Sequence, residues 1–127
     1  MSDKIIRKIA VIFVTDVVSF SKLMERDEDQ TLQSFRACKS ILDNLFEEHS
    51  GRIFNTAGDS VLAEFPSAVS AVICAAEFQK LVKERNASVE PLAEMHFRVG
   101  LNMGDVIVEG HNLYGDGVNV AARLEAL

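Results

Sequence analysis

Residues 51–65 read Gly-Arg-Ile-Phe-Asn-Thr-Ala-Gly-Asp-Ser-Val-Leu-Ala-Glu-Phe, and the rest of the chain is best understood from this stretch. Two apolar runs, one around Ile53 and one at residues 61–65, flank Gly58 and Asp59. Glycine gives the backbone the freedom that a tight turn requires, and the acid occupies the tip of that turn. The stretch therefore predicts a β-hairpin with the carboxylate of Asp59 at its apex.

A second acid, Asp16, follows another apolar run. Residues 9–14 read Ile-Ala-Val-Ile-Phe-Val, which is typical of a central strand that is covered on both faces. Asp16 is therefore expected at the carboxyl end of a buried strand, where the chain turns. Its side chain either caps the next helix or has a functional role, and the local sequence leaves both interpretations open.

The composition is that of a single globular domain of 127 residues. A net charge of −6 argues against a nucleic-acid-binding surface, but not against a nucleotide whose phosphates are neutralised by divalent metal. Cys38 and Cys74 lie in helical patterns without metal-ligand spacing, which favours reduced thiols in the core. No signal-peptide core or membrane-length apolar run is present, so we expect a cytoplasmic domain that can be part of a larger protein.

Two long helices are predicted on either side of the hairpin. The first runs from about Asp27 to His49, with apolar residues at helical spacing. The second begins after Ser67, a good capping residue, and ends near Arg85 or Asn86. Its buried stripe is predicted to consist of Val69, Val72, Ile73, Ala76 and Leu81, with Phe78 in the stripe or at its margin.

The last third of the chain predicts two strands and a helix. Residues 97–101 alternate as a half-buried strand, residues 103–105 (Met-Gly-Asp) are expected to turn it, and residues 106–108 form a partner strand. Residues 118–127 are predicted to be helical. The order β-α-β-β-α-β-β-α fits an α+β fold of the ferredoxin-like, split βαβ type, in which an antiparallel sheet packs on helices.

In such a sheet the first strand and the hairpin are neighbours, so Asp16 and Asp59 can approach each other. Two adjacent carboxylates repel unless they share a proton or cations, and oxygen ligands of this kind suit Mg²⁺ or Mn²⁺. The turn through Ser19, Phe20 and Ser21 offers backbone N–H groups that can bind phosphate oxygens. The alternative is that the two aspartates are unrelated and merely solvated.

Three ordered segments carry a more specific signal. They read Asp-Val-Val-Ser-Phe-Ser (16–21), Asn-Thr-Ala-Gly-Asp (55–59) and Tyr-Gly-Asp-Gly-Val-Asn-Val-Ala-Ala-Arg-Leu (114–124). Together they resemble the signature segments of class III adenylyl and guanylyl cyclase catalytic domains, bacterial members most closely. The resemblance extends in register from about Lys8 to Leu127, so residues 1–127 are interpreted as one such domain. Family domains continue through further strands, and we therefore expect this one to lack its C-terminal strands.

The resemblance implies an enzyme that converts a purine nucleoside triphosphate into a 3′,5′-cyclic nucleotide and pyrophosphate for signalling. Asp16 and Asp59 would hold two Mg²⁺ or Mn²⁺ ions, with the carbonyl of Val17 as an extra ligand. Asn119 would orient the ribose, and Arg123 would stabilise charge on the phosphate. In this family two domains pair head to tail and each site lies across the interface, so the resemblance implies a homodimer and an inactive monomer.

Two positions depart from the family pattern. Asn55 stands where a lysine is usual, and Asn112 stands where an aspartate is usual; in adenylyl cyclases these two residues recognise adenine. An amide offers both a donor and an acceptor, so the pair is expected to accept either purine, with ATP slightly favoured over GTP. The same two asparagines leave open a degenerate cyclase-like module that binds nucleotide or dimerises to regulate another domain.

Two other interpretations fit the sequence poorly. A receiver-like switch with Asp16 as the phosphate acceptor would need a second acid beside it and five alternating βα units. A cyclic-di-GMP synthase would need a Gly-Gly-acidic-acidic-Phe hairpin, whereas residues 57–61 read Ala-Gly-Asp-Ser-Val.

Overall fold

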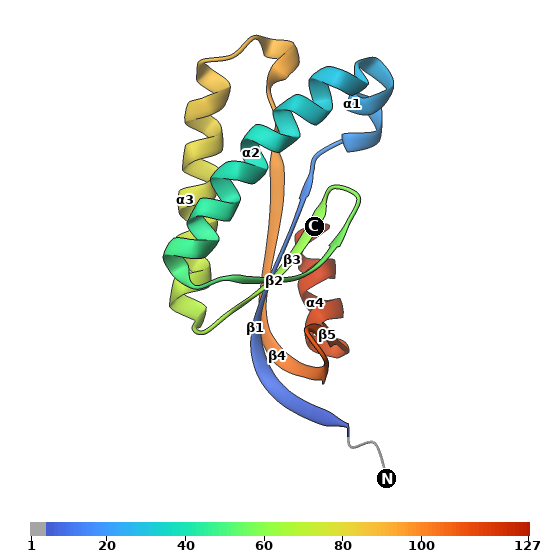
Figure 1. Cartoon of the computed structure of the whole chain (residues 1–127), viewed down its shortest axis with the longest axis vertical. Coiled ribbons are helices and arrows are strands. Elements are labelled where there is room, and N and C mark those ends of the chain that lie inside the picture. The colour runs from blue at the N-terminus through green and yellow to red at the C-terminus, as the bar shows by residue number, and fades with distance from the viewer. Residues whose placement is uncertain (1–4) are drawn as a thin grey trace.

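The structure, a computed structural model, describes residues 5–127 and shows one antiparallel sheet with helices on both faces (Figure 1). The strands are β1 (Ile6–Val17), β2 (Arg52–Ala57), β3 (Ser60–Phe65), β4 (Phe97–Glu109) and β5 (Asn112–Tyr114), in the sheet order β2-β3-β1-β4-β5. The helices are α1 (Phe20–Arg26), α2 (Glu28–His49), α3 (Ala68–Ala87) and α4 (Asp116–Glu125), with a short 3-10 helix, η1, at Pro91–Ala93. The predicted α+β architecture is confirmed. Within residues 5–127, no helix has the length and apolar character needed to cross a membrane.

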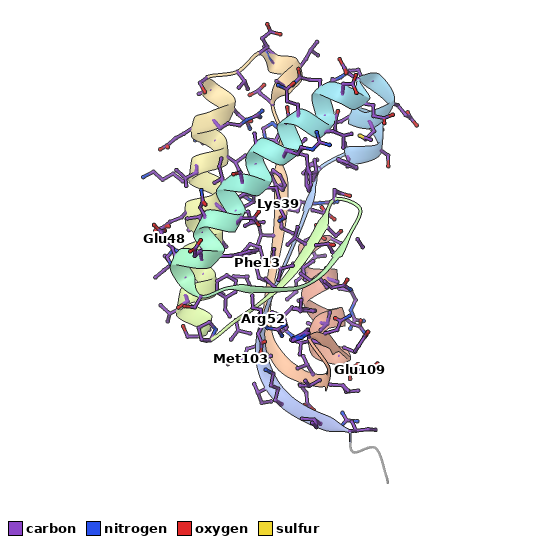
Figure 2. All side chains as sticks on the ribbon, in the orientation of Figure 1. Phe13, Lys39, Glu48, Arg52, Met103 and Glu109 are labelled. Atoms are coloured by element: carbon purple, nitrogen blue, oxygen red, sulfur yellow. The ribbon has the colours of Figure 1, made fainter. Side chains whose placement is uncertain are left out.

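The central strand β1 separates two cores, which explains why its sequence is apolar without alternation. Val11, Phe13 and Val17 pack in the larger core, beneath α2 and α3. Ala10, Ile12 and Val14 face the smaller core, beneath α4. Phe13 is completely buried, and its ring centroid lies 5.2 Å from that of Phe46 on α2 (Figure 2). Burial on both faces holds β1 firmly, and Asp16 lies near its carboxyl end.

The predicted hairpin is present. β2 and β3 are joined by Gly58 and Asp59, and Gly58 has φ +59°, a conformation that glycine adopts without strain. β3 pairs with β1, which makes the hairpin a neighbour of the central strand as expected. The first long helix is also confirmed as α2, whose first turn is capped by the side chain of Asp27. Helix α1, which precedes it, was not predicted.

The prediction of a turn at residues 103–105 is wrong, because β4 is one continuous strand of 13 residues. The chain reverses at Gly110 and His111 instead, and β5 is the partner strand. The glycines of β4 have a different purpose: a Cβ at Gly100 would lie 2.4 Å from the Ala121 carbonyl oxygen. They allow α4 to lie directly against the strand.

The predicted buried stripe of α3 is also wrong. Val69, Val72 and Ile73 are 68%, 56% and 44% exposed, and Ala76 and Leu81 are exposed too. The buried side is formed by Ala71, Cys74, Phe78, Val82 and Asn86. Because α3 carries apolar residues on both sides, helical spacing alone does not identify the buried one. Small residues and Phe78, whose ring packs 4.9 Å from that of Phe97, decide it. Cys38 and Cys74 are both free and buried, as predicted.

Candidate functional site

Asp16 and Asp59 come together at the carboxyl end of β1. The β1–β3 pairing places Thr15 opposite Val61, so the hairpin turn lies beside the last residues of β1. The backbone N–H of Val17 donates a hydrogen bond to Oδ2 of Asp59, at 2.8 Å. This bond orients the Asp59 carboxylate toward the strand end that carries Asp16.

A pocket of about 350 Å³ opens at this place. The residues predicted from the sequence to bind metal or phosphate all line it: Asp16, Val17, Ser19, Phe20, Ser21 and Asp59. Two cationic residues that were not predicted, Lys22 and Arg98, also line it. The pocket is open and polar, which suits a charged ligand. The carbonyl of Val17, expected as an extra metal ligand, belongs to a residue of the same pocket and stays a prediction.

The start of α1 forms one wall of the pocket. Ser19 adopts a left-handed conformation with φ 58°, and α1 begins at the next residue. The first N–H groups of a helix have no partners within that helix. The N–H groups of Phe20, Ser21 and Lys22 are of this kind, and these residues line the pocket. A phosphate-binding role for this segment stays a prediction.

Arg98 connects Asp16 to a buried acid on α4. Arg98 lies opposite Asp16 in the β1–β4 pairing, and its Nη2 is 3.3 Å from Oδ1 of Asp16. Its Nε is 3.2 Å from Oε1 of Glu125, whose side chain is only 6% exposed. That oxygen makes no well-aligned hydrogen bond within the described residues. Burial, followed by the hydrogen bond and charge of Asp16, raises the pKa of Glu125 to about 7.

The raised pKa of Glu125 predicts how stability depends on pH. A carboxyl group with a higher pKa in the folded chain binds its proton more tightly there than in the unfolded chain. The contribution of Glu125 to the free energy of unfolding is therefore complete below about pH 4.5 and is lost as the pH rises toward 7. Over this range the free energy of unfolding of the wild type should fall relative to that of Glu125→Gln, whose side chain does not titrate. Urea denaturation at several pH values measures this. Parallel pH profiles for the two proteins would contradict it.

The donor set of the pocket fits a hard divalent cation. Asp16 and Asp59 offer carboxylate oxygens, and Mg²⁺ and Mn²⁺ prefer such ligands together with waters and substrate phosphates. The pocket includes no cysteine or histidine, which softer metals favour. Arg98 and Lys22 balance part of the acidic charge.

Asn119 and Arg123 do not join this pocket. Both are exposed on α4, whose residues Gly117, Ala121 and Glu125 are the buried ones. The two side chains therefore lie on a free side of the helix, one turn apart as predicted. Within one chain the structure separates them from the pocket that Asp16 and Asp59 line.

The two asparagines expected to contact the base lie on strands at opposite edges of the sheet. Asn55 is exposed on β2, and Asn112 is half-buried at the start of β5. The preceding and following residues, Phe54 and Leu113, nevertheless pack in the same small core. The sheet therefore curls enough to bring β2 and β5 close together at this end, although neither asparagine lines the pocket of Asp16 and Asp59.

The chain thus combines an antiparallel sheet, an acidic pocket at the end of β1 and a helix, α4, whose outer side carries Asn119 and Arg123. The family model described as "Adenylate and Guanylate cyclase catalytic domain" matches residues 1–127, and the chain belongs to this family. The curated protein "Putative adenylate cyclase 3" of Rhizobium meliloti is 47% identical over 126 residues, which are 98% of this chain and 22% of that protein. An adenylate cyclase of Streptomyces coelicolor is 33% identical over 122 residues, covering 95% of this chain and 30% of that one. The chain thus spans less than a third of the length of these curated relatives.

Solved structures of cyclases share this fold. An adenylate/guanylate cyclase/hydrolase from Silicibacter pomeroyi superposes with a TM-score of 0.87 at 35% identity, covering 97% of this chain and 72% of that one. A bacterial light-regulated adenylyl cyclase superposes with a TM-score of 0.85 at 28% identity, covering 98% of this chain and 71% of that one. The resemblance to class III cyclases and the predicted fold are confirmed.

Proposed function

We propose that this chain is a catalytic domain that cyclises a purine nucleoside triphosphate to a 3′,5′-cyclic nucleotide and pyrophosphate, for cyclic-nucleotide signalling in the cytoplasm. The observation that carries the proposal is the single pocket that gathers Asp16, Asp59 and the start of α1 in a chain of the cyclase family. Receiver-like and cyclic-di-GMP interpretations have no comparable support.

In this proposal Asp16 and Asp59 would hold two Mg²⁺ or Mn²⁺ ions, whose charge would make the ribose 3′-hydroxyl more acidic and pyrophosphate a better leaving group. The Val17 N–H keeps the Asp59 carboxylate in place, at 2.8 Å. The first N–H groups of α1, with Lys22 and Arg98 nearby, bind the triphosphate. The 3′-hydroxyl oxygen would bond to the α-phosphorus of the same nucleotide while the bond from that phosphorus to the bridging oxygen breaks, so that pyrophosphate leaves in line and the hydroxyl proton passes to water.

Asn119 and Arg123 complete the site from a second copy of the chain. Because they are exposed on α4 and lie outside the acidic pocket, they are free to reach into the pocket of a partner. There Asn119 orients the ribose and Arg123 stabilises the negative charge that develops on the phosphate. The active species is thus a homodimer with its sites at the interface.

ATP is the proposed preferred substrate, ahead of GTP. Curated relatives that are 47% and 33% identical are named adenylate cyclases, which supports this preference. Asn55 and Asn112 would contact the base, and their amides pair with either purine. The same two residues favour the second candidate, a degenerate module that binds nucleotide or dimerises without turnover.

A product assay separates the two candidates. The intact protein is incubated with ATP or GTP and with Mg²⁺ or Mn²⁺, and the products are resolved by chromatography. We expect cyclic nucleotide and pyrophosphate in equal amounts, more from ATP than from GTP, and none when EDTA removes the metal. Metal-dependent nucleotide binding without any cyclic product would favour the degenerate module instead.

A further inference from the structure

Arg52 connects the two edge strands of the sheet. It is the first residue of β2, yet its Nη1 donates a hydrogen bond of 2.7 Å to the carbonyl oxygen of His111, in the turn between β4 and β5. β2 and β5 are the outermost strands on opposite sides of the sheet, so this bond joins its two edges. In Figure 2, Arg52 and Glu109, the last residue of β4, lie at the same end of the sheet.

Arg52 is itself held in place by Glu64, the residue opposite it on β3. Its Nη2 lies 2.9 Å from Oε1 of Glu64, and the other oxygen of Glu64 pairs with Nζ of Lys8 at 2.6 Å. Burial by itself would raise the pKa of Glu64, but the hydrogen bonds from Lys8 and Arg52 lower it on balance. Glu64 therefore stays ionised and fixes the guanidinium that contacts His111.

The amide of Asn112, the next residue after His111, has a defined orientation. The N–H of Leu113 donates to its Oδ1 at 2.8 Å, and a backbone N–H can only donate, so this side of the amide must be the oxygen. Its Nδ2 then donates to the hydroxyl of Tyr114, at 3.0 Å. Asn112 and Tyr114 project from the same face of β5, because residues two apart in a strand do so.

We propose that Arg52 and Tyr114 are positioning residues for purine recognition. Arg52 sets the separation of the strands that carry Asn55 and Asn112, and Tyr114 sets the orientation of the Asn112 amide. The inference rests on the proposed function only for the role of the two asparagines at the base.

The arrangement determines what a purine would meet. Among residues 5–127, Asn112 Nδ2 donates one hydrogen bond, to Tyr114, which leaves its second N–H to donate to the base. The Tyr114 oxygen accepts from Asn112 and keeps its own hydrogen as a further donor. Adenine and guanine both carry ring acceptors, so such a pair binds either base and discriminates weakly, provided that the amide is held still.

The first test removes one oxygen atom. In Tyr114→Phe the Asn112 amide loses its partner and rotates more freely, so KM for ATP should rise roughly 3- to 10-fold while kcat changes less than about twofold. A double-mutant cycle with Asn112→Ala identifies the route of the effect: if Tyr114 acts through Asn112, the double variant is no worse than Asn112→Ala alone. Additive effects, or an unchanged KM in Tyr114→Phe, would overturn this role of Tyr114.

The second test addresses Arg52. Arg52→Lys keeps a cation beside Glu64 but cannot donate to Glu64 and His111 together through a planar fork. We expect a similar rise in KM with little change in kcat. Arg36→Lys, an exposed change on α2, is the matched control and should leave KM unaltered. Equal KM values for Arg52→Lys and the wild type would overturn the role of Arg52.

A spectroscopic readout does not require turnover. Tyr114 is the only tyrosine of the chain, so labelling tyrosine with ¹³C at the ring carbon that bears the hydroxyl gives one NMR signal. The metal is Mg²⁺, which is diamagnetic, and the ligand is 3′-deoxy-ATP, which has no attacking hydroxyl. Binding of this ligand should shift the Tyr114 signal. Asn112→Ala should shift the signal even without nucleotide. A protein without cyclase activity that still shows both shifts would contradict the proposed function but support the positioning role. A signal that saturating nucleotide leaves unchanged would overturn the role at the base.

Discussion

Asp59→Ala is expected to reduce cyclase turnover by roughly 1,000-fold or more, because it removes one of the two carboxylates that line the proposed metal pocket. The same change leaves the Val17 N–H without the acceptor that lies 2.8 Å away in the wild type. Alanine therefore alters both the charge of the site and the local structure. A loss of activity in this variant alone would not distinguish the two causes.

Asp59→Asn separates the loss of charge from the loss of the hydrogen bond. The amide oxygen of asparagine can still accept the hydrogen bond from Val17, but the side chain carries no charge. We expect Asp59→Asn to unfold at nearly the wild-type urea concentration and to lose almost as much turnover as Asp59→Ala. Isothermal titration with Mn²⁺ should show weaker metal binding in both variants. Wild-type turnover in either variant would contradict the assignment of Asp59.

Features that depend on neighbouring residues were predictable from the sequence. The turn at Gly58 and Asp59 follows from local backbone chemistry, and β1 follows from a run that is apolar on both faces. Once β1 and the hairpin are adjacent, Asp16 and Asp59 must meet. The metal and phosphate residues predicted for this pocket were found together for that reason.

Features that depend on the exact register of distant strands, or on which side of a helix meets the sheet, were not predictable. Arg98 lies beside Asp16 only because β1 and β4 pair in a particular register, and these residues are 82 positions apart in the chain. Glycines in β4 were interpreted as a turn, since a single sequence does not reveal that α4 presses against Gly100. The buried side of α3 was not predicted for a similar reason, because it depends on the contact of Phe78 with Phe97, a residue outside the helix.

Residues Asn119 and Arg123 show where a single chain provides too little information. The motif around them was recognisable, but their place relative to Asp16 and Asp59 was not derivable from local patterns. In the structure they are exposed on α4, outside the acidic pocket. In the proposed homodimer a second copy of the chain would supply Asn119 and Arg123 to the pocket.

Arg123→Ala is expected to lower turnover by roughly 100- to 1,000-fold, the usual loss when a donor to transition-state charge is removed. Arg123 is exposed, so its replacement should leave the free energy of unfolding within about 0.5 kcal/mol of the wild type. The sharper prediction concerns a mixture. Neither Asp59→Asn nor Arg123→Ala should be active by itself, but equal amounts of the two proteins should regain activity when their subunits exchange.

The size of the recovery follows from the symmetry of the proposed dimer. Random exchange gives about half heterodimers, and in each heterodimer one site carries both substitutions while the other carries neither. The mixture should therefore reach about one quarter of the wild-type activity. A mixture of Asp59→Asn with Asp16→Asn is the matched control and should stay inactive, because both residues line the pocket of the same chain. If the first mixture also stays inactive although exchange is demonstrated, each site is built within one chain and the proposed dimeric site is wrong.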